Sequence, residues 1–180
     1  MSIAIRRWLR TDLPTIQRLL LDTWLDAYGP FIPRADLIGY HHDQYSQAKL
    51  EALFDDPDVT GLVAEVAGAV AGYAKLYHAR SEQRFYVHQL YILPASQGLG
   101  LGHRLMACAE ERARELGADR IWLGVIVKNA QAVAWYKKMG YIVTETSPFV
   151  MGSTSVEHYI GYLPLPLPKS RAQSPDSTPD

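Results

Sequence analysis

The feature that most constrains this chain is a glycine-rich turn at residues 97–102, which reads Gln-Gly-Leu-Gly-Leu-Gly. The run before it, Phe85–Leu93, is aromatic and branched and is stopped by Pro94, as expected of a buried strand. The run after it repeats leucine and alanine at helical spacing. Glycines let the backbone approach an anion, and a helix start adds free N–H donors and partial positive charge. The segment therefore predicts a phosphate-binding turn between a strand and a helix.

Two common phosphate-binding patterns do not fit these glycines. No Gly-Lys-Ser/Thr follows, which excludes the P-loop. The dinucleotide-binding fingerprint requires its last glycine where His103 stands. On the glycines alone, a plain strand-to-helix turn that binds nothing stays an open alternative.

The surroundings of the turn resemble the GNAT family of N-acetyltransferases. The family's phosphate loop, Arg/Gln-x-x-Gly-x-Gly/Ala, is matched by Gln97, Gly100 and Gly102. Its preceding strand ends in an apolar-x-Pro pattern, which Ile92-Leu93-Pro94 repeats. Downstream, the family carries a strand, an Asn, a small residue, a Tyr and a Gly-aromatic pair. These pieces follow in the same order here as residues 121–127, Asn129, Ala132, Tyr136 and Gly140-Tyr141.

The close resemblance covers about residues 85–145, and a looser one covers about 1–163. Within the family, the sequence is most similar to the bacterial polyamine-acetyltransferase-like branch. Supporting segments are Gly72–Leu76, Leu90–Ile92, Ile121–Val125 and Phe149–Gly152.

The order of strand-like and helical runs predicts an α/β fold. Strands are expected at 3–8, 59–66, 69–77, 85–93, 121–127, 141–144 and 156–162, and helices at 13–27, 35–54, 100–116 and 130–139. This order predicts a mixed, mainly antiparallel sheet with one parallel pair, where the 100–116 helix crosses between strands. The resemblance implies the GNAT fold, with helices on both faces of a central sheet that is splayed at the cofactor cleft.

Length and composition fit one domain. The chain has 180 residues, 48% of them hydrophobic, which is enough for a single core. Its formal net charge of −1 gives no sign of a nucleic-acid groove or an anionic membrane surface. We expect an acetyltransferase domain at 1–163 and a disordered, Pro- and Ser-rich tail at 164–180.

The sequence also predicts a cytoplasmic location. Cys108 is the only cysteine, so no disulfide forms within the chain, which suits a reducing compartment. Neither a signal-peptide pattern nor a membrane-spanning apolar stretch is found. No spacing of histidines or cysteines resembles a metal site.

The resemblance implies acetyl-CoA as the acetyl donor. It places the pyrophosphate on the turn at 97–103 and the pantetheine arm beside Tyr91–Leu93, like an added strand, with a backbone N–H toward the thioester carbonyl. Asn129 matches a position that hydrogen-bonds this arm, and it is equally a helix N-cap candidate. The expected cofactor-binding residues are Tyr91, Ile92, Leu93, Gln97, Gly98, Leu99, Gly100, Leu101, Gly102, His103, Asn129, Ala132 and Tyr136.

Acetyl transfer to an amine needs a proton donor for the departing thiolate and a proton acceptor for the amine. By resemblance Tyr136 is the donor; its alternative role is that of a core tyrosine. His88 stands where polyamine-acetylating relatives carry an acidic residue. An imidazole with a pKa near 6.5 is a candidate base, directly or through water, and its alternative role is a hydrogen-bonded histidine on a strand face. Residues in a strand alternate between faces, so Tyr86 and His88 are predicted to point the same way.

The expected acceptor-binding residues are Trp24, Tyr28, Tyr86 and His88. They belong to a site formed by the segment 24–33, the strand around 77–78, and a loop at 147–155. This lining is aromatic and polar, with few carboxylates. It fits a primary amine of a small molecule or peptide, attacking acetyl-CoA directly in a ternary complex. The alternatives are a polyamine (spermidine or spermine) acetyltransferase and a non-enzymatic acyl-CoA-binding module. A homodimer and a monomer both stay open.

Overall fold

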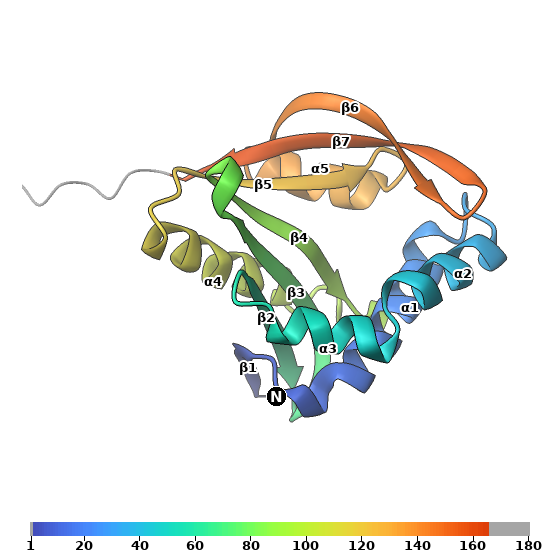
Figure 1. The fold of residues 1–180 in the computed structure, drawn as a ribbon, viewed down its shortest axis with the longest axis horizontal. Coiled ribbons are helices and arrows are strands. Elements are labelled where there is room, and N and C mark those ends of the chain that lie inside the picture. The colour runs from blue at the N-terminus through green and yellow to red at the C-terminus, as the bar shows by residue number, and fades with distance from the viewer. Residues whose placement is uncertain (1, 166–180) are drawn as a thin grey trace, which may run out of the picture.

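A computed structural model describes residues 2–165 as one sheet covered by helices (Figure 1). The strands are β1 (Ile3–Arg7), β2 (Val59–Val66), β3 (Ala69–Ala79), β4 (Arg84–Ile92), β5 (Arg120–Ile126), β6 (Ile142–Met151) and β7 (Thr154–Pro164). The helices are α1 (Leu13–Tyr28), α2 (Arg34–Gln44), α3 (Gln47–Asp55), α4 (Leu101–Glu115) and α5 (Ala130–Lys138). The predicted α/β class is confirmed, and no helix within the described residues is long and apolar enough to cross a membrane.

The strands lie in the order β1-β2-β3-β4-β5-β7-β6, and every neighbouring pair except β4–β5 is antiparallel. The parallel pair is the one that α4 connects, as predicted. It holds together at one register position, Tyr86 opposite Trp122. Beyond that point β4 and β5 diverge, as Figure 1 shows. The sheet is therefore splayed at the site where the sequence predicts a cofactor cleft.

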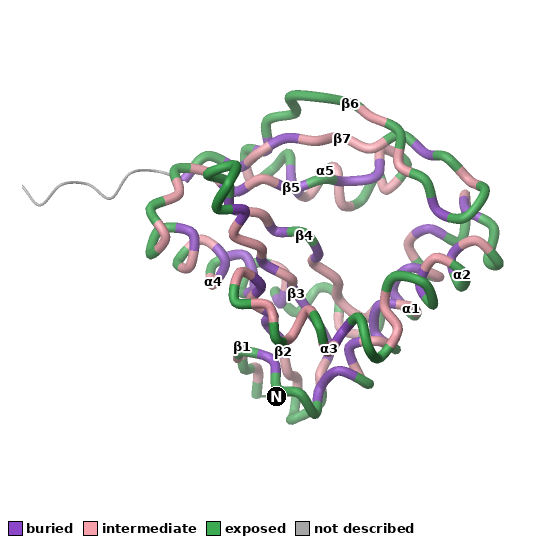
Figure 2. The backbone as a smooth tube through the Cα atoms, in the orientation of Figure 1, coloured by how far each residue is buried: buried purple, intermediate pink, exposed green. Residues whose placement is uncertain are grey.

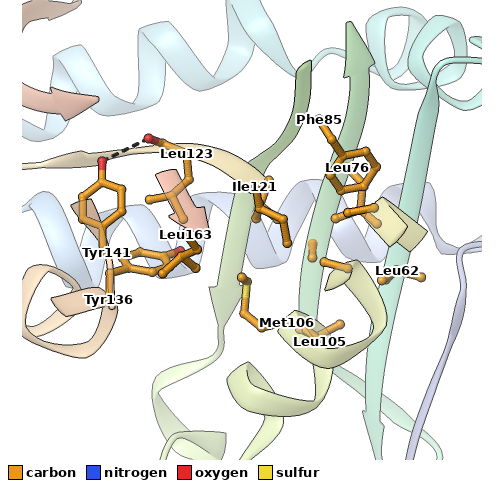
Figure 3. Close-up of a cluster of buried hydrophobic side chains, with 14 of the residues drawn as sticks. Leu62, Leu76, Phe85, Leu105, Met106, Ile121, Leu123, Tyr136, Tyr141 and Leu163 are labelled. Atoms are coloured by element: carbon orange, nitrogen blue, oxygen red, sulfur yellow. Dashed lines mark hydrogen bonds between the residues drawn. The ribbon is translucent and has the colours of Figure 1, made fainter. Parts of the chain in front are cut away.

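Helices cover both faces of the sheet. On one face α4 and α5 pack against the strands through a cluster that includes Leu105, Met106, Ile121 and Leu123 (Figure 3). The Tyr141 hydroxyl donates to the Leu123 carbonyl at 3.1 Å and so ties the segment after α5 to β5. Burying apolar surface on this scale is the dominant favourable term in folding.

On the opposite face, α1 and α3 pack over β2 and β3 through a second cluster, in which Leu13, Leu20, Leu50 and Tyr73 are fully buried. The amphipathic period read from the α1 sequence points Leu13 and Leu20 inward. The two clusters therefore lie on opposite faces of the sheet, and the first also crosses the splay, since it includes Val87 of β4 and Leu123 of β5.

A third cluster joins the α1–α2 region to the part of the sheet beyond the splay. Trp24, Tyr28 and Ile32 from the α1–α2 region pack against Ile126 and other residues of the β5–β7 part of the sheet. The tip of the β6–β7 hairpin is fixed to the same region by polar contacts. The Asp36 carboxylate accepts hydrogen bonds from Thr154 Oγ1 at 2.6 Å and from Ser153 Oγ at 3.0 Å. These contacts close one end of the splay.

The single helix predicted at 35–54 is wrong, because the chain forms α2 and α3 with a break at Tyr45-Ser46. The Tyr45 carbonyl accepts a hydrogen bond from the Gln17 side chain at 2.6 Å instead of continuing the helix. The turn also lets the Tyr45 hydroxyl accept from Gln89 on β4 at 2.6 Å. Two contacts with distant segments override the local helical pattern.

The C-terminal hairpin is longer than predicted. The strands expected at 141–144 and 156–162 extend to Ile142–Met151 and Thr154–Pro164, so the expected loop at 147–155 is mostly strand. Leu165 is buried, and its N–H donates to the Asp119 carbonyl, which moves the end of the domain past the predicted boundary at 163. The rest of the predicted tail, 166–180, lies outside the described residues.

β6 forms one edge of the sheet and is exposed along most of its length (Figure 2). Its apolar side chains Ile142 and Val150 are 45% and 55% exposed. The pairing with β7 shifts register between Val143 and Glu145, which leaves Thr144 as an extra residue in the edge strand.

We predict that Gly61→Ala destabilises the fold. A Cβ on Gly61 would lie 2.1 Å from the ring of Trp8, which is buried over β2. Overpacking of this kind costs about 1–3 kcal/mol in the free energy of unfolding. Gly39→Ala in α2 is the matched control, since a Cβ there meets nothing within 4 Å. It should stabilise slightly, by up to about 1 kcal/mol, because alanine favours helix. Denaturant unfolding measures both; equal stabilities would contradict the packing described.

Candidate functional site

The splay opens into a cleft of about 690 Å³. Its walls come from α1 and the loop after it, β4, the turn at 96–103, β5 and the start of α5. Of the predicted site residues, those lining the cleft are Tyr28, His88, Tyr91, Ile92, Gln97, Gly98, Gly100, Leu101, Gly102, His103, Asn129, Ala132 and Tyr136. Segments far apart in the sequence thus meet at one concave surface, the usual form of a small-molecule site.

The glycine-rich turn has the backbone that an anion site requires. Gly98 and Gly100 have φ of +80° and +77°, a region that residues with a Cβ rarely adopt. Gly100 directly precedes α4 and supplies no side-chain cap, so the first N–H groups of the helix stay free of a side-chain partner. The Gln97 side chain lies across the turn, accepting from the Gln131 amide of α5 at 3.2 Å. The turn therefore presents N–H donors and positive helix-end charge to the cleft.

β4 has an unpaired edge along the cleft. The Leu93 N–H donates to the Ala71 carbonyl at 2.9 Å, toward β3. Since neighbouring residues of a strand direct their backbone groups to opposite edges, the Ile92 N–H and carbonyl face β5. β5 has already diverged there, and its single pairing with β4 is at Tyr86. An extended ligand arm can therefore bind this edge as an added strand.

A β-bulge places His88 at the mouth of this edge. Leu76 pairs with Val87 and Lys75 pairs with Gln89, which leaves His88 as the extra residue of β4. Its ring lies 5.1 Å from the rings of both Tyr77 and Tyr86, so the prediction that Tyr86 and His88 share a face is confirmed. Its imidazole has no hydrogen-bond partner among residues 2–165, unlike the satisfied histidine that was the alternative.

The environment makes His88 a weak base. Part of the ring is exposed, while its neighbours screen the remainder from water. This burial and the nearby positive charge of Lys75 lower the pKa of His88 to about 4. Its imidazole is therefore neutral at pH 7, with a free lone pair.

α5 presents two predicted residues to the cleft. The Asn129 side chain accepts from the Ala132 N–H at 3.2 Å, so its role as a helix N-cap is confirmed. Tyr136 is 7% exposed and packs between Trp135 and Tyr141. Its hydroxyl hydrogen-bonds no other described residue, and burial raises the pKa of Tyr136 well above 10. The phenol is therefore a protonated donor that faces the cleft.

Two of the predicted acceptor residues lie outside the cleft lining. Trp24 is 2% exposed and is enclosed by aromatic rings, including those of Tyr40 and Tyr45. The Tyr86 hydroxyl donates to the Glu82 carboxylate at 2.7 Å, away from the cleft. Tyr28 does line the cleft, with its hydroxyl 3.4 Å from that of Tyr91.

Two predicted cofactor residues are also outside the lining. Leu93 packs with the cluster under α1, and Leu99 points outward, 42% exposed. Asp26 and Phe31 line the cleft within the predicted acceptor segment 24–33, while the sequence missed other lining residues: Gln89, Gly124, Lys128 and Trp135. A glycine inside a strand run, as at 124, is a recognisable signal of close approach, while the others carry no local signature. Within the described residues no group of three potential metal ligands is found.

The chain has relatives over most of its length. Residues 15–141 match the family described as "Acetyltransferase (GNAT) family". An uncharacterized N-acetyltransferase of Mycobacterium bovis is 28% identical over 83% of this chain and 96% of its own length. The streptothricin acetyltransferase of Streptomyces lavendulae is 33% identical over 63% of this chain and 61% of its own. The crystal structure of a PaiA N-acetyltransferase from Thermoplasma acidophilum with coenzyme A superposes with a TM-score of 0.75 at 22% identity, covering 88% and 98% of the two chains.

We predict that Gly100→Asp weakens acetyl-CoA binding at least tenfold more than Gly100→Asn. The two side chains have the same shape and both tolerate positive φ, so their difference isolates the carboxylate charge. A charge within a few ångströms of a phosphate costs more than the ~1.4 kcal/mol that a factor of ten represents. Titration calorimetry of the folded variants measures both affinities. Equal affinities for the two variants would show that no phosphate of acetyl-CoA binds at this turn.

Proposed function

Because the chain belongs to the acetyltransferase (GNAT) family and is thereby an acetyl-CoA-dependent N-acetyltransferase, we propose that its cleft carries out direct acetyl transfer to a primary amine. The acceptor belongs to a small molecule or a peptide, and both substrates are bound together when the amine attacks. The observation that carries this proposal is the unpaired edge of β4, which opens into the same cleft as the glycine-rich turn.

Both ends of a coenzyme A thioester find suitable partners in the cleft. The turn at 97–103 offers N–H donors for the pyrophosphate. The free edge of β4 offers the Ile92 N–H to the pantetheine arm, while the Ile92 carbonyl accepts a long hydrogen bond from Gln97 Nε2 at 3.5 Å. A thioester held along this edge lies beside the bulge at His88, where an N–H of β4 is available to its carbonyl oxygen as negative charge develops.

Tyr136 is suited to protonate the leaving group. When the amine lone pair attacks the thioester carbon, the C–S bond breaks and the sulfur leaves as a thiolate, which takes up a proton. The Tyr136 hydroxyl is protonated, uncommitted and exposed to the cleft. Burial is the main cause of the raised pKa of Tyr136, and the neighbouring Tyr91 and Tyr141 raise it further. This arrangement supports Tyr136 as the general acid.

His88 is suited to take the proton from the amine, directly or through one water. The imidazole is neutral, lines the cleft and lacks a competing hydrogen bond within residues 2–165. An imidazole with a pKa of about 4 holds the proton of the amine only briefly. The exposure of His88 to solvent therefore matters, because water takes the proton on.

A polyamine acceptor is the less supported alternative. A cleft that selects polycations places several carboxylates along the acceptor path. Asp26 is the one carboxylate that lines this cleft, and it lies exposed on α1. Coenzyme A release, followed with a thiol reagent across a panel of amines, tests the proposal. If acetyl-CoA binds but no amine releases its thiol, the cleft is a binding module.

We predict that Tyr136→Phe lowers kcat by about 10²-fold and leaves acetyl-CoA affinity nearly unchanged, since the ring stays and only the proton donor is lost. Tyr141→Phe is the matched control, because the Tyr141 hydroxyl bonds the Leu123 and Tyr159 carbonyls outside the cleft. It should lower stability by about 1 kcal/mol with kcat preserved. A loss of affinity equal to the loss of kcat would give Tyr136 a binding role instead.

We also predict that His88 contributes no inflection to the pH profile between pH 5.5 and 8. A group with a pKa of about 4 is deprotonated throughout that range, so kcat/KM rises only with deprotonation of the acceptor amine. His88→Gln should lower kcat/KM by about tenfold or more at every pH in this range, in parallel with wild type. If the kcat/KM profiles of wild type and His88→Gln superimpose, His88 does not act as the base. A wild-type limb near pH 6.5 that the variant loses would show an ordinary histidine pKa in the folded protein.

A further inference from the structure

Lys75 is a cation at the acceptor side of the sheet that lacks an anion. It is half-buried on β3, and within residues 2–165 no carboxylate lies in ion-pair distance of it. Its ammonium lies 5.9 Å from the centroid of the Tyr45 ring, a weak substitute for a counter-ion. Removing an ammonium from water without pairing it is costly, and burial accordingly lowers the pKa of Lys75. A structural role in an ion pair therefore does not account for it.

Lys75 is not itself among the residues that line the cleft, but its neighbours on β4 are. Its register partner on β4 is Gln89, which lines the cleft together with the bulge residue His88. Gln89 Nε2 donates to the Tyr45 hydroxyl, while Gln89 Oε1 is buried without a hydrogen-bond partner. The charge of Lys75 acts on the His88 ring. Lys75 therefore lies next to two residues of the cleft lining, Gln89 and His88.

A second cation lies in the cleft lining itself. Lys128 lines the cleft from the β5–α5 connection, with its ammonium 5.8 Å from the Phe31 ring, and it also forms no ion pair with a described residue. Against these two cations stands Asp26, which is exposed on α1. Cations therefore outnumber carboxylates in and directly behind the cleft lining, and an acceptor that carries a negative group would balance them.

We propose that Lys75 binds a carboxylate of the acceptor, so that the substrates of this enzyme are amino acids rather than polyamines or simple monoamines. This inference rests on the acetyl-transfer function proposed above and specifies its acceptor class. The amine end of the acceptor lies at His88, and the carboxylate end lies toward Lys75, with Lys128 contributing to the positive field around it. A carboxylate also supplies the charge-assisted hydrogen bonds that an ammonium with three donors requires.

The test compares each amino acid with its own carboxamide. The two differ only in the carboxylate, and the amine of the carboxamide loses its proton more readily. A preference for the acid must therefore come from binding. Wild type should prefer L-amino acids over their carboxamides in kcat/KM by about 10- to 100-fold, the range of a charge-assisted hydrogen bond. A series of α-, β- and γ-amino acids then reports how far the carboxylate site lies from the reacting amine.

Lys75→Met should abolish this preference by raising KM for the acids, with kcat for the carboxamides unchanged. Lys75→Arg should retain part of it, because the positive charge remains. Lys49→Met, on the exposed surface of α3, is the control and should behave as wild type. Acetyl-CoA affinity, measured by calorimetry, should be equal in all four proteins and shows that each variant folds.

Two outcomes would overturn the inference. One is a wild type that acetylates carboxamides or monoamines as efficiently as acids, or prefers spermidine. The other is a Lys75→Met variant that loses activity on acids and carboxamides equally, which would give Lys75 a general role in catalysis. Failure of the acetyl-transfer function itself is distinguishable, since no amine of any kind would then release coenzyme A.

Discussion

The strand β4 must satisfy its backbone hydrogen bonds on both edges, and within residues 2–165 the neighbouring strand β5 pairs with one of these edges only at Tyr86. Unpaired backbone groups at a sheet edge favour the addition of a further strand. The rest of the structure is organised around keeping this edge open and its surroundings rigid. The bulge at His88 interrupts the regular pleat of β4 beyond its last pairing with β5, and the glycine-rich turn follows the end of the same strand.

An open gap in the middle of a sheet needs packing on both faces to hold it, and three hydrophobic clusters provide this packing, one of them reaching from Val87 of β4 to Leu123 of β5. One cluster lies under α4 and α5 and a second lies under α1 and α3. The third joins Trp24 and Tyr28 to Ile126, on the far side of the gap. Trp24 is not itself in the lining, but its ring packs against Tyr28 and Tyr91, which are, so it supports the cleft wall from behind.

Much of the fold was predictable because its signals are local. The period of apolar residues defined most strands and helices, and a glycine-rich turn before a helix has few backbone conformations available to it. The predictions that failed depend on distant contacts. The break at Tyr45 requires Gln17 and Gln89 as partners, and the long hairpin β6–β7 is stabilised by pairing across its whole length rather than by its own composition. The same holds for the site. Tyr136 and Asn129 belong to a recognisable sequence pattern. Lys75 does not, and it draws notice only because no described carboxylate forms an ion pair with it.

The edge strand β6 has a consequence for assembly. An exposed edge with apolar side chains such as Ile142 and Val150 would ordinarily invite another chain to extend the sheet. Here Thr144 interrupts the regular spacing of the edge, and Pro148 has no N–H to donate. Between these two positions only a few consecutive residues keep an uninterrupted pattern of donors and acceptors. At the β6 edge the strand geometry thus prevents the sheet from being extended. A neighbouring copy at this edge would have to bind through side chains instead of adding a strand.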